Sequence, residues 1–334
     1  MKPKLFLHIG HSKVASSSIQ AFQDANIDYM RSQGFLVADM EGTFPTEGPV
    51  FSCPVGVLQT ARDAGPEGFE LLHVRLRDLH ETLTRRRSKF DRAVISAENL
   101  CNPRFELMFE PMRELFDMHL IYYIRRQDEW LISAWKQWGI KSGKNLKEYC
   151  MQGTQSRYPA YTASIDRWAP LVQTMHVRPL HASTLHDGSI TADYAHALGL
   201  DGAKMQHTGI SNPSFDAAVL DVLSRNPYLF EHPDDDRIFH FLTEFLPKEI
   251  KPMRAILDWE VRTGICRFFE EENRALHQRF FPDADYDKLF SPHEFNGGQQ
   301  PTPPQQLLYR FLGLQLRALM NMHQELKDLR AKVP

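Results

Sequence analysis

The chain has 334 residues, which is enough for one large domain or two smaller ones with a sizeable buried core. Its 39 basic and 42 acidic side chains give a formal net charge of −3, so no global field favours nucleic acid or an acidic membrane surface as a partner. The four cysteines lie far apart without metal-ligand spacing, and we expect reduced thiols and no metal site. No apolar run approaches the roughly 18 residues of a membrane span, and we expect a cytoplasmic protein without one.

The first ordered stretch predicts a buried strand, a tight turn and the start of a helix. Residues 5–9 form a short apolar run, typical of a parallel strand covered on both faces, and Gly10 allows a sharp bend. The turn carries Lys13, and three hydroxyl side chains follow directly before a helical pattern; they are Ser16, Ser17 and Ser18. Backbone N–H groups, a cation and hydroxyls at one helix N-terminus are typical of an anion-binding site.

The spacing within this turn indicates which anion it suits. A Walker A loop needs a glycine directly before its lysine, but Lys13 follows Gly10 by three residues with no glycine beside it. The stretch instead resembles the 5′-phosphosulfate loop of sulfotransferases, whose bacterial members tend to read His-Ile-Gly-x-x-Lys-Thr-Gly-Thr-Thr-Ser-Ile-Gln. The matching residues are His8, Ile9, Gly10, Lys13, Ser18, Ile19 and Gln20, with Ser16 and Ser17 matching as hydroxyls.

Three residues depart from that pattern: Ser12 stands for the usual Pro, Val14 for Thr or Ser, and Ala15 for Gly. Glycine allows closer approach of the backbone to an anion, so Ala15 is the departure that bears on activity. The resemblance implies that the phosphosulfate is bound by the loop residues Gly10, Lys13, Val14, Ala15, Ser16, Ser17 and Ser18. The alternative is a strand-to-helix turn in which Ser16 only caps the helix.

Glu98 follows the next predicted strand, residues 91–97. Ligands of doubly wound sheets bind beyond the C-terminal strand ends, so we expect Glu98 to share an edge with Lys13. The segment Ser-Ala-Glu-Asn-Leu resembles the Ser-Ser-Glu-x-Leu of bacterial sulfotransferases, which implies that Glu98 is the general base. A carboxylate at a strand end can also serve as a helix cap or an ion-pair partner.

A third element begins at Arg125, which ends the predicted strand 119–125, and Ser133 follows eight residues later on a helix. This arrangement resembles the 3′-phosphate element of sulfotransferases, in which an arginine and a serine bind the ribose 3′-phosphate of 3′-phosphoadenosine 5′-phosphosulfate (PAPS). A guanidinium is a forked donor suited to phosphate oxygens, and the hydroxyl adds a further donor.

The remaining elements predict an α/β fold, a parallel sheet flanked by helices with a helical C-terminal part. The last strand is expected at residues 174–180. Beyond residue 201 only helices are expected, one of them at residues 256–280. Residues 41–68, with five glycines and four prolines, are expected to form a long irregular loop or lid. The predicted division is a PAPS-binding core at 1–200 and a mainly helical extension at 201–334.

The resemblance implies a PAPS-dependent sulfotransferase that needs no metal. Glu98 would take the proton of an acceptor hydroxyl, and Lys13 with the loop amides would stabilise charge on the sulfuryl group and the departing phosphate. Two alternatives stay open. One is a P-loop-like kinase or other nucleotide-dependent transferase, and the other is a non-catalytic binding protein that retains the fold.

A carbohydrate hydroxyl is the favoured acceptor, with a lipid or a small-molecule alcohol as alternatives. Indole rings can stack on sugar faces and cations can bind an acidic glycan. The candidate residues are Trp130, Trp135, Trp138, Lys141, Lys144 and Arg157.

Residues 304–331 predict one long amphipathic helix with a leucine stripe. The stripe consists of Leu308, Leu312, Leu316, Leu319, Leu326 and Leu329. The helix either lies along its own domain or pairs with the same helix of a second chain to form a homodimer.

Overall fold

A computed structural model describes residues 2–207, 215–232, 235–245, 257–291 and 303–331. Contacts divide the chain into two units, and each unit is made of three separate segments of the sequence. Unit 1 consists of Met1–Arg126, Pro159–Ile210 and Glu270–Leu289, and unit 2 of Gln127–Tyr158, Ser211–Phe269 and Phe290–Pro334. The sequence predicted a single division after residue 200 instead.

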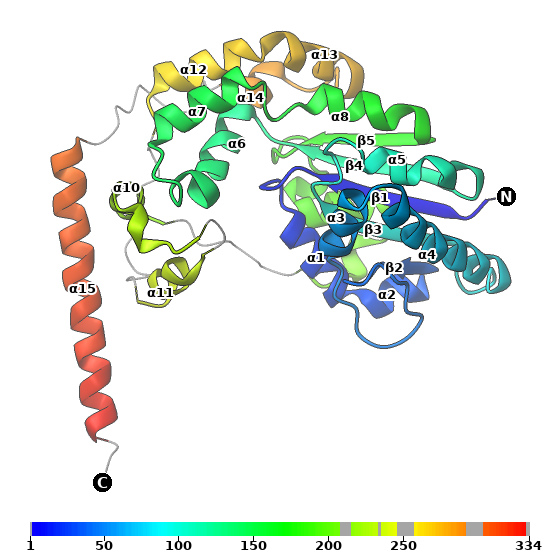
Figure 1. Ribbon diagram of the computed structural model, residues 1–334, viewed down its shortest axis with the longest axis horizontal. Coiled ribbons are helices and arrows are strands. Elements are labelled where there is room, and N and C mark those ends of the chain that lie inside the picture. The colour runs from blue at the N-terminus through cyan, green and yellow to red at the C-terminus, as the bar shows by residue number, and fades with distance from the viewer. Residues whose placement is uncertain (1, 208–214, 233–234, 246–256, 292–302, 332–334) are drawn as a thin grey trace. The chain divides into compact units, whose positions relative to one another are not determined.

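Unit 1 is built on a five-stranded, all-parallel sheet with the strand order β2-β3-β1-β4-β5 (Figure 1). The strands are β1 (Lys4–Gly10), β2 (Phe35–Val37), β3 (Arg92–Glu98), β4 (Asp117–Ile124) and β5 (Thr174–Pro179). Since β1 is central, its C-terminal end lies between those of β3 and β4. The predicted α/β fold with a parallel sheet is confirmed.

Helices flank this sheet. They are α1 (Ser16–Ala25), α2 (Ile27–Ser32), α3 (Val55–Asp63), α4 (Pro66–Arg85), α5 (Phe105–Phe109), α8 (Tyr161–Trp168), α9 (Ile190–Leu198), α13 (Glu270–Phe280) and α14 (Tyr286–Phe290), whose last residue falls in unit 2. The prediction of an irregular segment at 41–68 is wrong in its second half, which contains α3 and the start of α4. These two helices pack against each other, and Pro66 is accommodated because a first helical turn needs no N–H from it.

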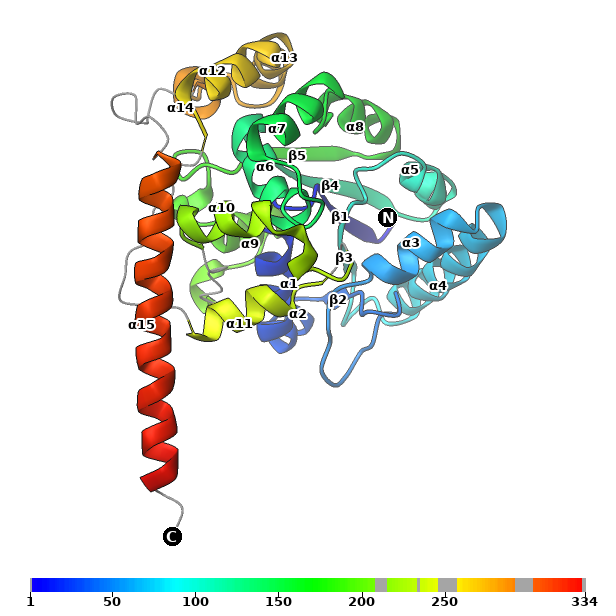
Figure 2. The same cartoon turned by 60° about the vertical axis from the view of Figure 1, so that its left-hand side comes forward.

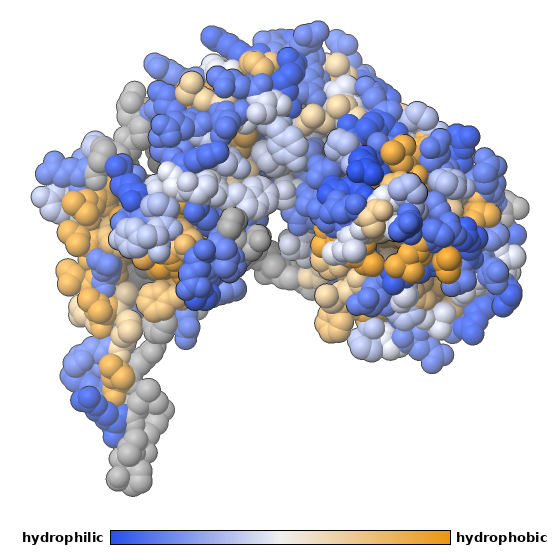
Figure 3. Space-filling view, in the orientation of Figure 1, coloured by the Kyte–Doolittle hydropathy of each residue, from blue (hydrophilic) through white to orange (hydrophobic). Residues whose placement is uncertain are grey.

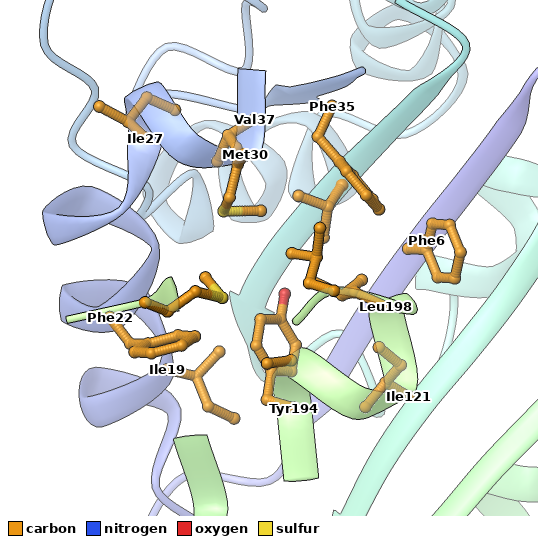
Figure 4. Packing of buried hydrophobic residues seen from close by; sticks show 14 of the residues in the cluster. Phe6, Ile19, Phe22, Ile27, Met30, Phe35, Val37, Ile121, Tyr194 and Leu198 are labelled. Atoms are coloured by element: carbon orange, nitrogen blue, oxygen red, sulfur yellow. The ribbon is translucent and has the colours of Figure 1, made fainter. Parts of the chain in front are cut away.

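The core of unit 1 lies on both faces of the sheet. On one face, residues of alternating strand positions pack against helices α1 and α9 (Figure 4). The residues of this cluster include Phe6, Val94, Ile121, Ile19, Phe22, Tyr194 and Leu198. The other alternate residues of β1 are Leu5, Leu7 and Ile9, and all three are fully buried. The prediction that β1 is covered on both faces is thereby confirmed.

Unit 2 is helical in its described residues. Its helices are α6 (Gln127–Ala134), α7 (Leu146–Gln155), α10 (Ala217–Arg225), α11 (Arg237–Phe245), α12 (Trp259–Phe268) and α15 (Pro304–Ala331). A π-helical turn at Trp135–Gly139 extends α6. The helical C-terminal part is confirmed, but the single helix expected at 256–280 divides at Phe269 into α12 of unit 2 and α13 of unit 1.

Short 3-10 turns complete the described structure at Glu110–Glu114, Ala169–Leu171, His186–Gly188, Gly202–Lys204 and Pro227–Leu229. Within the ranges that the structure describes, no helix combines the length and the apolarity that crossing a membrane would need.

Candidate functional site

The loop between β1 and α1, residues 11–15, has a backbone shape suited to an anion. Lys13 and Ala15 both have left-handed backbone angles, with φ of 68° and 65°. When left-handed and right-handed residues follow one another, their successive backbone N–H groups point to the same side. The resulting concave arrangement of N–H groups is called a nest and binds anions. Left-handed angles are costly for residues with a Cβ, which explains why glycine is usual at position 15 in the resembling pattern.

The start of α1 adds to this nest. Ala15 occupies the N-cap, and no side chain caps the helix. The first-turn N–H groups of a helix lack intrahelical partners, and the helix dipole favours negative charge there. The Oγ atom of Ser16 is buried and has no hydrogen-bond partner in the structure. The alternative in which Ser16 caps the helix therefore does not hold, and its hydroxyl is available as a donor.

The space around Gly10, at the end of β1, is too small for a side chain. A Cβ built on Gly10 would lie 2.8 Å from Ser16 Oγ and 3.7 Å from His8 Nε2. Contacts as short as 2.8 Å essentially never occur for real Cβ atoms, so a residue here would displace the Ser16 hydroxyl. The glycine of the pattern is thus needed for close packing of β1 against the start of α1.

His8 lies on β1, two residues before Gly10, and is buried. Its Nδ1 atom is 2.8 Å from Ser96 Oγ on the neighbouring strand, whereas Nε2 has no hydrogen-bond partner in the structure. Burial lowers the pKa of His8 to about 3, so the ring is neutral. A neutral imidazole places no charge of its own beneath the loop.

Glu98 ends β3, where it stands opposite Gly10 in the parallel register. Partial burial raises the pKa of this carboxyl above its ordinary 4.5, while the charge of Lys13 and a hydrogen bond from Ser12 act in the opposite direction. The interaction with Lys13 means that the two proposed catalytic residues do share one edge of the sheet. The sequence did not predict the part played by Ser12, although its hydroxyl replaces a proline that could not donate.

Arg125 directly follows β4 and reaches the same loop. Its Nη1 atom donates to the carbonyl oxygen of Lys13 over 3.3 Å. The Tyr161 hydroxyl donates to the Arg125 carbonyl oxygen at 2.6 Å and accepts from the Arg125 N–H at 3.1 Å. Tyr161 therefore fixes the backbone from which the guanidinium projects. Its position in the sequence gave no sign of this, because the contact joins segments 36 residues apart.

Ser133, predicted to act with Arg125, lies half-buried on α6 and belongs to unit 2. The remaining loop residues stay together in unit 1: Val14 is fully buried in the core cluster, and Ser17 and Ser18 belong to the first turn of α1. His11, a further titratable residue of the loop, is buried beside the Tyr122 and Tyr161 rings. Burial, with the nearby Arg167 charge, lowers its pKa to about 3.

The residues predicted to hold an acceptor have structural contacts in unit 2. Trp130 and Trp135 are buried in its core and offer no exposed ring face to a sugar. The Lys141 ammonium is 2.8 Å from Asp236 and almost fully buried. Trp138 is half-buried, and the exposed Lys144 donates to Gln152 over 2.8 Å. Arg157, also exposed, has its guanidinium 5.3 Å from the centre of the Phe268 ring.

The described residues contain no group of three or more histidine, cysteine or acidic side chains placed to bind a metal. The polar groups at the sheet edge are of another kind: a nest of N–H groups, an orphaned hydroxyl and two cationic side chains. Donors of this kind suit the oxygens of a phosphate or sulfate group.

No protein-family model matches the chain. A comparison with curated proteins finds an uncharacterized protein of Archaeoglobus fulgidus that is 25% identical over 195 residues. The match covers 56% of this chain and 53% of the length of that relative. The comparison therefore provides a distant relative but no activity.

Proposed function

We propose that the chain is a sulfotransferase that moves a sulfuryl group from PAPS to a hydroxyl group of an acceptor. The observation that carries the proposal is the meeting of three segments at one edge of the unit 1 sheet. The β1–α1 loop brings the nest and Lys13, the end of β3 brings Glu98, and the end of β4 brings Arg125 to the Lys13 carbonyl. Each of these segments resembles a sulfotransferase element in the same chain order.

The fit of PAPS rests on the donors of the loop. The N–H groups at the start of α1, the buried Ser16 hydroxyl and the Lys13 ammonium would bind its 5′-phosphosulfate, and Arg125 would bind its 3′-phosphate. When bound, PAPS supplies the sulfuryl group and the phosphate that leaves it. Lys13 and the N–H groups stabilise negative charge at the loop as that phosphate departs.

Glu98 is the proposed general base, which takes the proton of the acceptor hydroxyl. A base works best when its pKa is close to the working pH, and partial burial raises the pKa of Glu98 in that direction. Lys13 and Ser12 keep the carboxylate oriented at the loop, because each interacts with its charged form. His11, whose pKa is lowered to about 3, is neutral at ordinary pH and a weaker proton acceptor.

A kinase-like transferase is the second candidate, because N–H groups at a helix N-terminus bind a nucleoside triphosphate as well as a phosphosulfate. Titration calorimetry with 3′-phosphoadenosine 5′-phosphate and with ATP distinguishes the two. Tighter binding of the bisphosphate supports the sulfotransferase, tighter binding of ATP supports the kinase, and binding of neither supports a protein that retains only the fold.

Turnover is tested with radiolabelled PAPS. Lys13→Ala should abolish sulfate transfer, whereas Lys4→Ala, an exposed lysine at the other end of β1, should leave it unchanged. Equal activity of the two variants would contradict the assignment of Lys13.

A carbohydrate hydroxyl is the proposed acceptor class. This choice rests on the chemistry of the residues alone: an indole ring and cations suit an acidic glycan, and Trp138, Lys144 and Arg157 are the candidate residues of unit 2 that keep exposed surface. Acceptors are screened with radiolabelled PAPS. Label in oligosaccharides supports the choice, and label only in lipid extracts or in small aromatic alcohols contradicts it.

A further inference from the structure

Helix α15 has one face packed within unit 2. Leu314 is buried there, and Phe311 packs against the same core cluster. The Arg310 guanidinium lies 2.6 Å from Asp216, the N-cap residue of α10. The helix contacts α10 and α11, and both views show its C-terminal half extending past these two helices (Figure 2).

A different face of α15 carries an exposed leucine stripe. The stripe consists of Leu308, Leu312, Leu316, Leu319 and Leu326, whose exposed fractions range from 44% to 64%. Apolar side chains gather on the surface of this helix in the space-filling view (Figure 3). Leu329, the last leucine of the predicted stripe, has a side chain outside the described part of the structure. The predicted stripe is therefore exposed, and other residues of α15 make its contacts within unit 2.

The spacing of the stripe is that of a helix-pairing seam. Leu312, Leu319 and Leu326 recur every seven residues, and Leu308 and Leu316 flank the first of them at four-residue steps. A seven-residue apolar repeat keeps one side of a helix against a partner helix of the same repeat. From Leu308 to Leu326 the stripe runs along about 27 Å of helix, at 1.5 Å per residue.

We propose that this stripe pairs with the same stripe of a second copy of the chain, forming a two-fold symmetric dimer. The partner must offer an apolar helix face of equal length. Elsewhere in the described ranges, large exposed apolar side chains number at most two in any one element, such as Leu71 and Val74 of α4. The face that matches the stripe in length and spacing is the stripe itself, which is the condition for an isologous contact.

The leucine positions fit a two-fold symmetric pair in either direction. Leu312 and Leu326 lie seven residues to either side of Leu319. A parallel partner would place leucine against leucine at each of the three positions. An antiparallel partner centred on the same residue would place Leu312 against Leu326. Both arrangements bring the two copies of Leu319 together.

A lipid surface is a poorer match for this face. Helices that lie on membranes combine an apolar face with a polar face rich in Lys and Arg. Residues 304–331 contain four basic residues and two acidic ones, and the basic Arg310 is already paired with Asp216. The remaining charges nearly cancel, so little electrostatic attraction to anionic lipids is expected.

The experiment measures mass by light scattering and sedimentation between 1 and 50 μM protein. The wild-type chain should have twice the 38.7 kDa of a monomer. The double variant Leu312→Glu/Leu319→Glu should be a monomer with unchanged helical circular dichroism. The matched control is Gln306→Glu/Gln324→Glu, which adds the same charge at exposed positions about 120° around the helix, and it should remain a dimer.

A wild-type monomer across this range, or a double variant that stays dimeric, would overturn the proposal. Co-sedimentation with anionic vesicles that depends on the two leucines, in a chain that stays monomeric, would overturn it in favour of a lipid surface. If the double variant fails to fold, cysteine cross-linking decides. Under mild oxidant Leu319→Cys should form a disulfide between chains in high yield and Gln324→Cys should not, and equal yields would contradict the pairing. These measurements do not depend on whether the chain is a sulfotransferase.

Discussion

Two charged pairs in the core of unit 2 contrast with two buried polar atoms at the edge of the unit 1 sheet. In unit 2, the fully buried carboxylate of Asp128 lies 2.6 Å from the Arg262 guanidinium, and the buried ammonium of Lys141 lies 2.8 Å from Asp236. At the edge of the unit 1 sheet, Ser16 Oγ and His8 Nε2 are buried without a partner. Most buried polar atoms in folded proteins find one, and leaving a group unpaired costs roughly 1–3 kcal/mol.

This difference separates groups that stabilise the fold from groups available to a ligand. The paired charges of unit 2 satisfy each other and have little capacity left for a further partner. The orphaned Ser16 hydroxyl lies where a nest of N–H groups and the Lys13 cation already favour an anion. A bound phosphate or sulfate oxygen would offset the cost of leaving that hydroxyl unpaired. Substitutions in the two places should therefore affect different properties.

After the abolished turnover expected of Lys13→Ala, the largest effect is expected at Glu98. Glu98→Gln keeps the size and hydrogen bonding of the side chain but cannot accept a proton, so turnover should fall by about 10²–10⁴. Affinity for 3′-phosphoadenosine 5′-phosphate should stay nearly unchanged, as calorimetry would measure. Glu114→Gln, an exposed carboxylate of the same unit, is the control and should keep full activity. A Glu98→Gln variant with a near-normal rate would mean that another group accepts the proton.

The pH dependence sharpens this test. The base must be ionised to act, so kcat/KM should fall as pH decreases through the pKa of Glu98. Partial burial raises that pKa, which places the acidic limb of the profile above the ordinary 4.5 of a glutamate. The limb should be absent from the residual activity of Glu98→Gln. An acidic limb at or below pH 4.5 in the wild-type profile would contradict the assignment of Glu98 as the base.

The next effect concerns the stability of unit 2. Arg262→Met removes the guanidinium that lies 2.6 Å from the buried Asp128 carboxylate, and breaking a buried ion pair should destabilise the fold by about 3–5 kcal/mol. Urea unfolding followed by circular dichroism measures the loss. Asp128→Leu/Arg262→Met removes both charges and should recover most of the stability. A loss below about 1 kcal/mol in the single variant would mean that the buried pair does not differ from a surface one.

Local sequence patterns predicted the elements that carry the candidate site, but not the contacts between segments that are distant in the sequence. The strand, turn and helix around Gly10, and the position of Glu98 at a strand end, follow from short apolar runs and their order in a parallel sheet. Ser12 donates a hydrogen bond to Glu98, 86 residues away. The Tyr161 hydroxyl binds the backbone of Arg125, 36 residues away. No local pattern encodes contacts over such separations.

The same reason explains the errors in the fold. Glycine and proline content predicted an irregular segment where α3 forms, because packing of α3 against α4 outweighs the weak helix propensity of residues such as Gly56. The periodic run at 256–280 gave no sign of the break at Phe269, which is fully buried in the unit 2 core. The break between the two helices thus coincides with the burial of this aromatic ring.

A smaller effect is expected from Arg125→Ala. Loss of one charged phosphate contact should weaken binding of 3′-phosphoadenosine 5′-phosphate by about 1.5–3 kcal/mol, or roughly 10- to 150-fold. The Arg125 side chain also donates to the Lys13 carbonyl, so some weakening could come from a loosened loop. Adenosine 5′-phosphosulfate, which lacks the 3′-phosphate, separates the two causes. Its affinity should hardly change, and an equal loss for both ligands would contradict a 3′-phosphate contact.

The smallest effect is expected at Ala15, where the unit 1 loop bears a cost of its own. Its backbone has φ 65° and ψ 17°, a left-handed conformation that costs an alanine about 1–2 kcal/mol more than a glycine. Ala15→Gly removes that cost but gives the unfolded chain more freedom, worth about 0.4–1 kcal/mol in the opposite direction. The net change should therefore be a gain of up to about 1.6 kcal/mol in unfolding free energy. Ala21→Gly, in the middle of α1, has only the unfavourable part and should lose about 1 kcal/mol, so urea unfolding of the two variants should give changes of opposite sign. Equal losses would mean that Ala15 is not held in the left-handed conformation, and the nest that supports the anion site would then be absent.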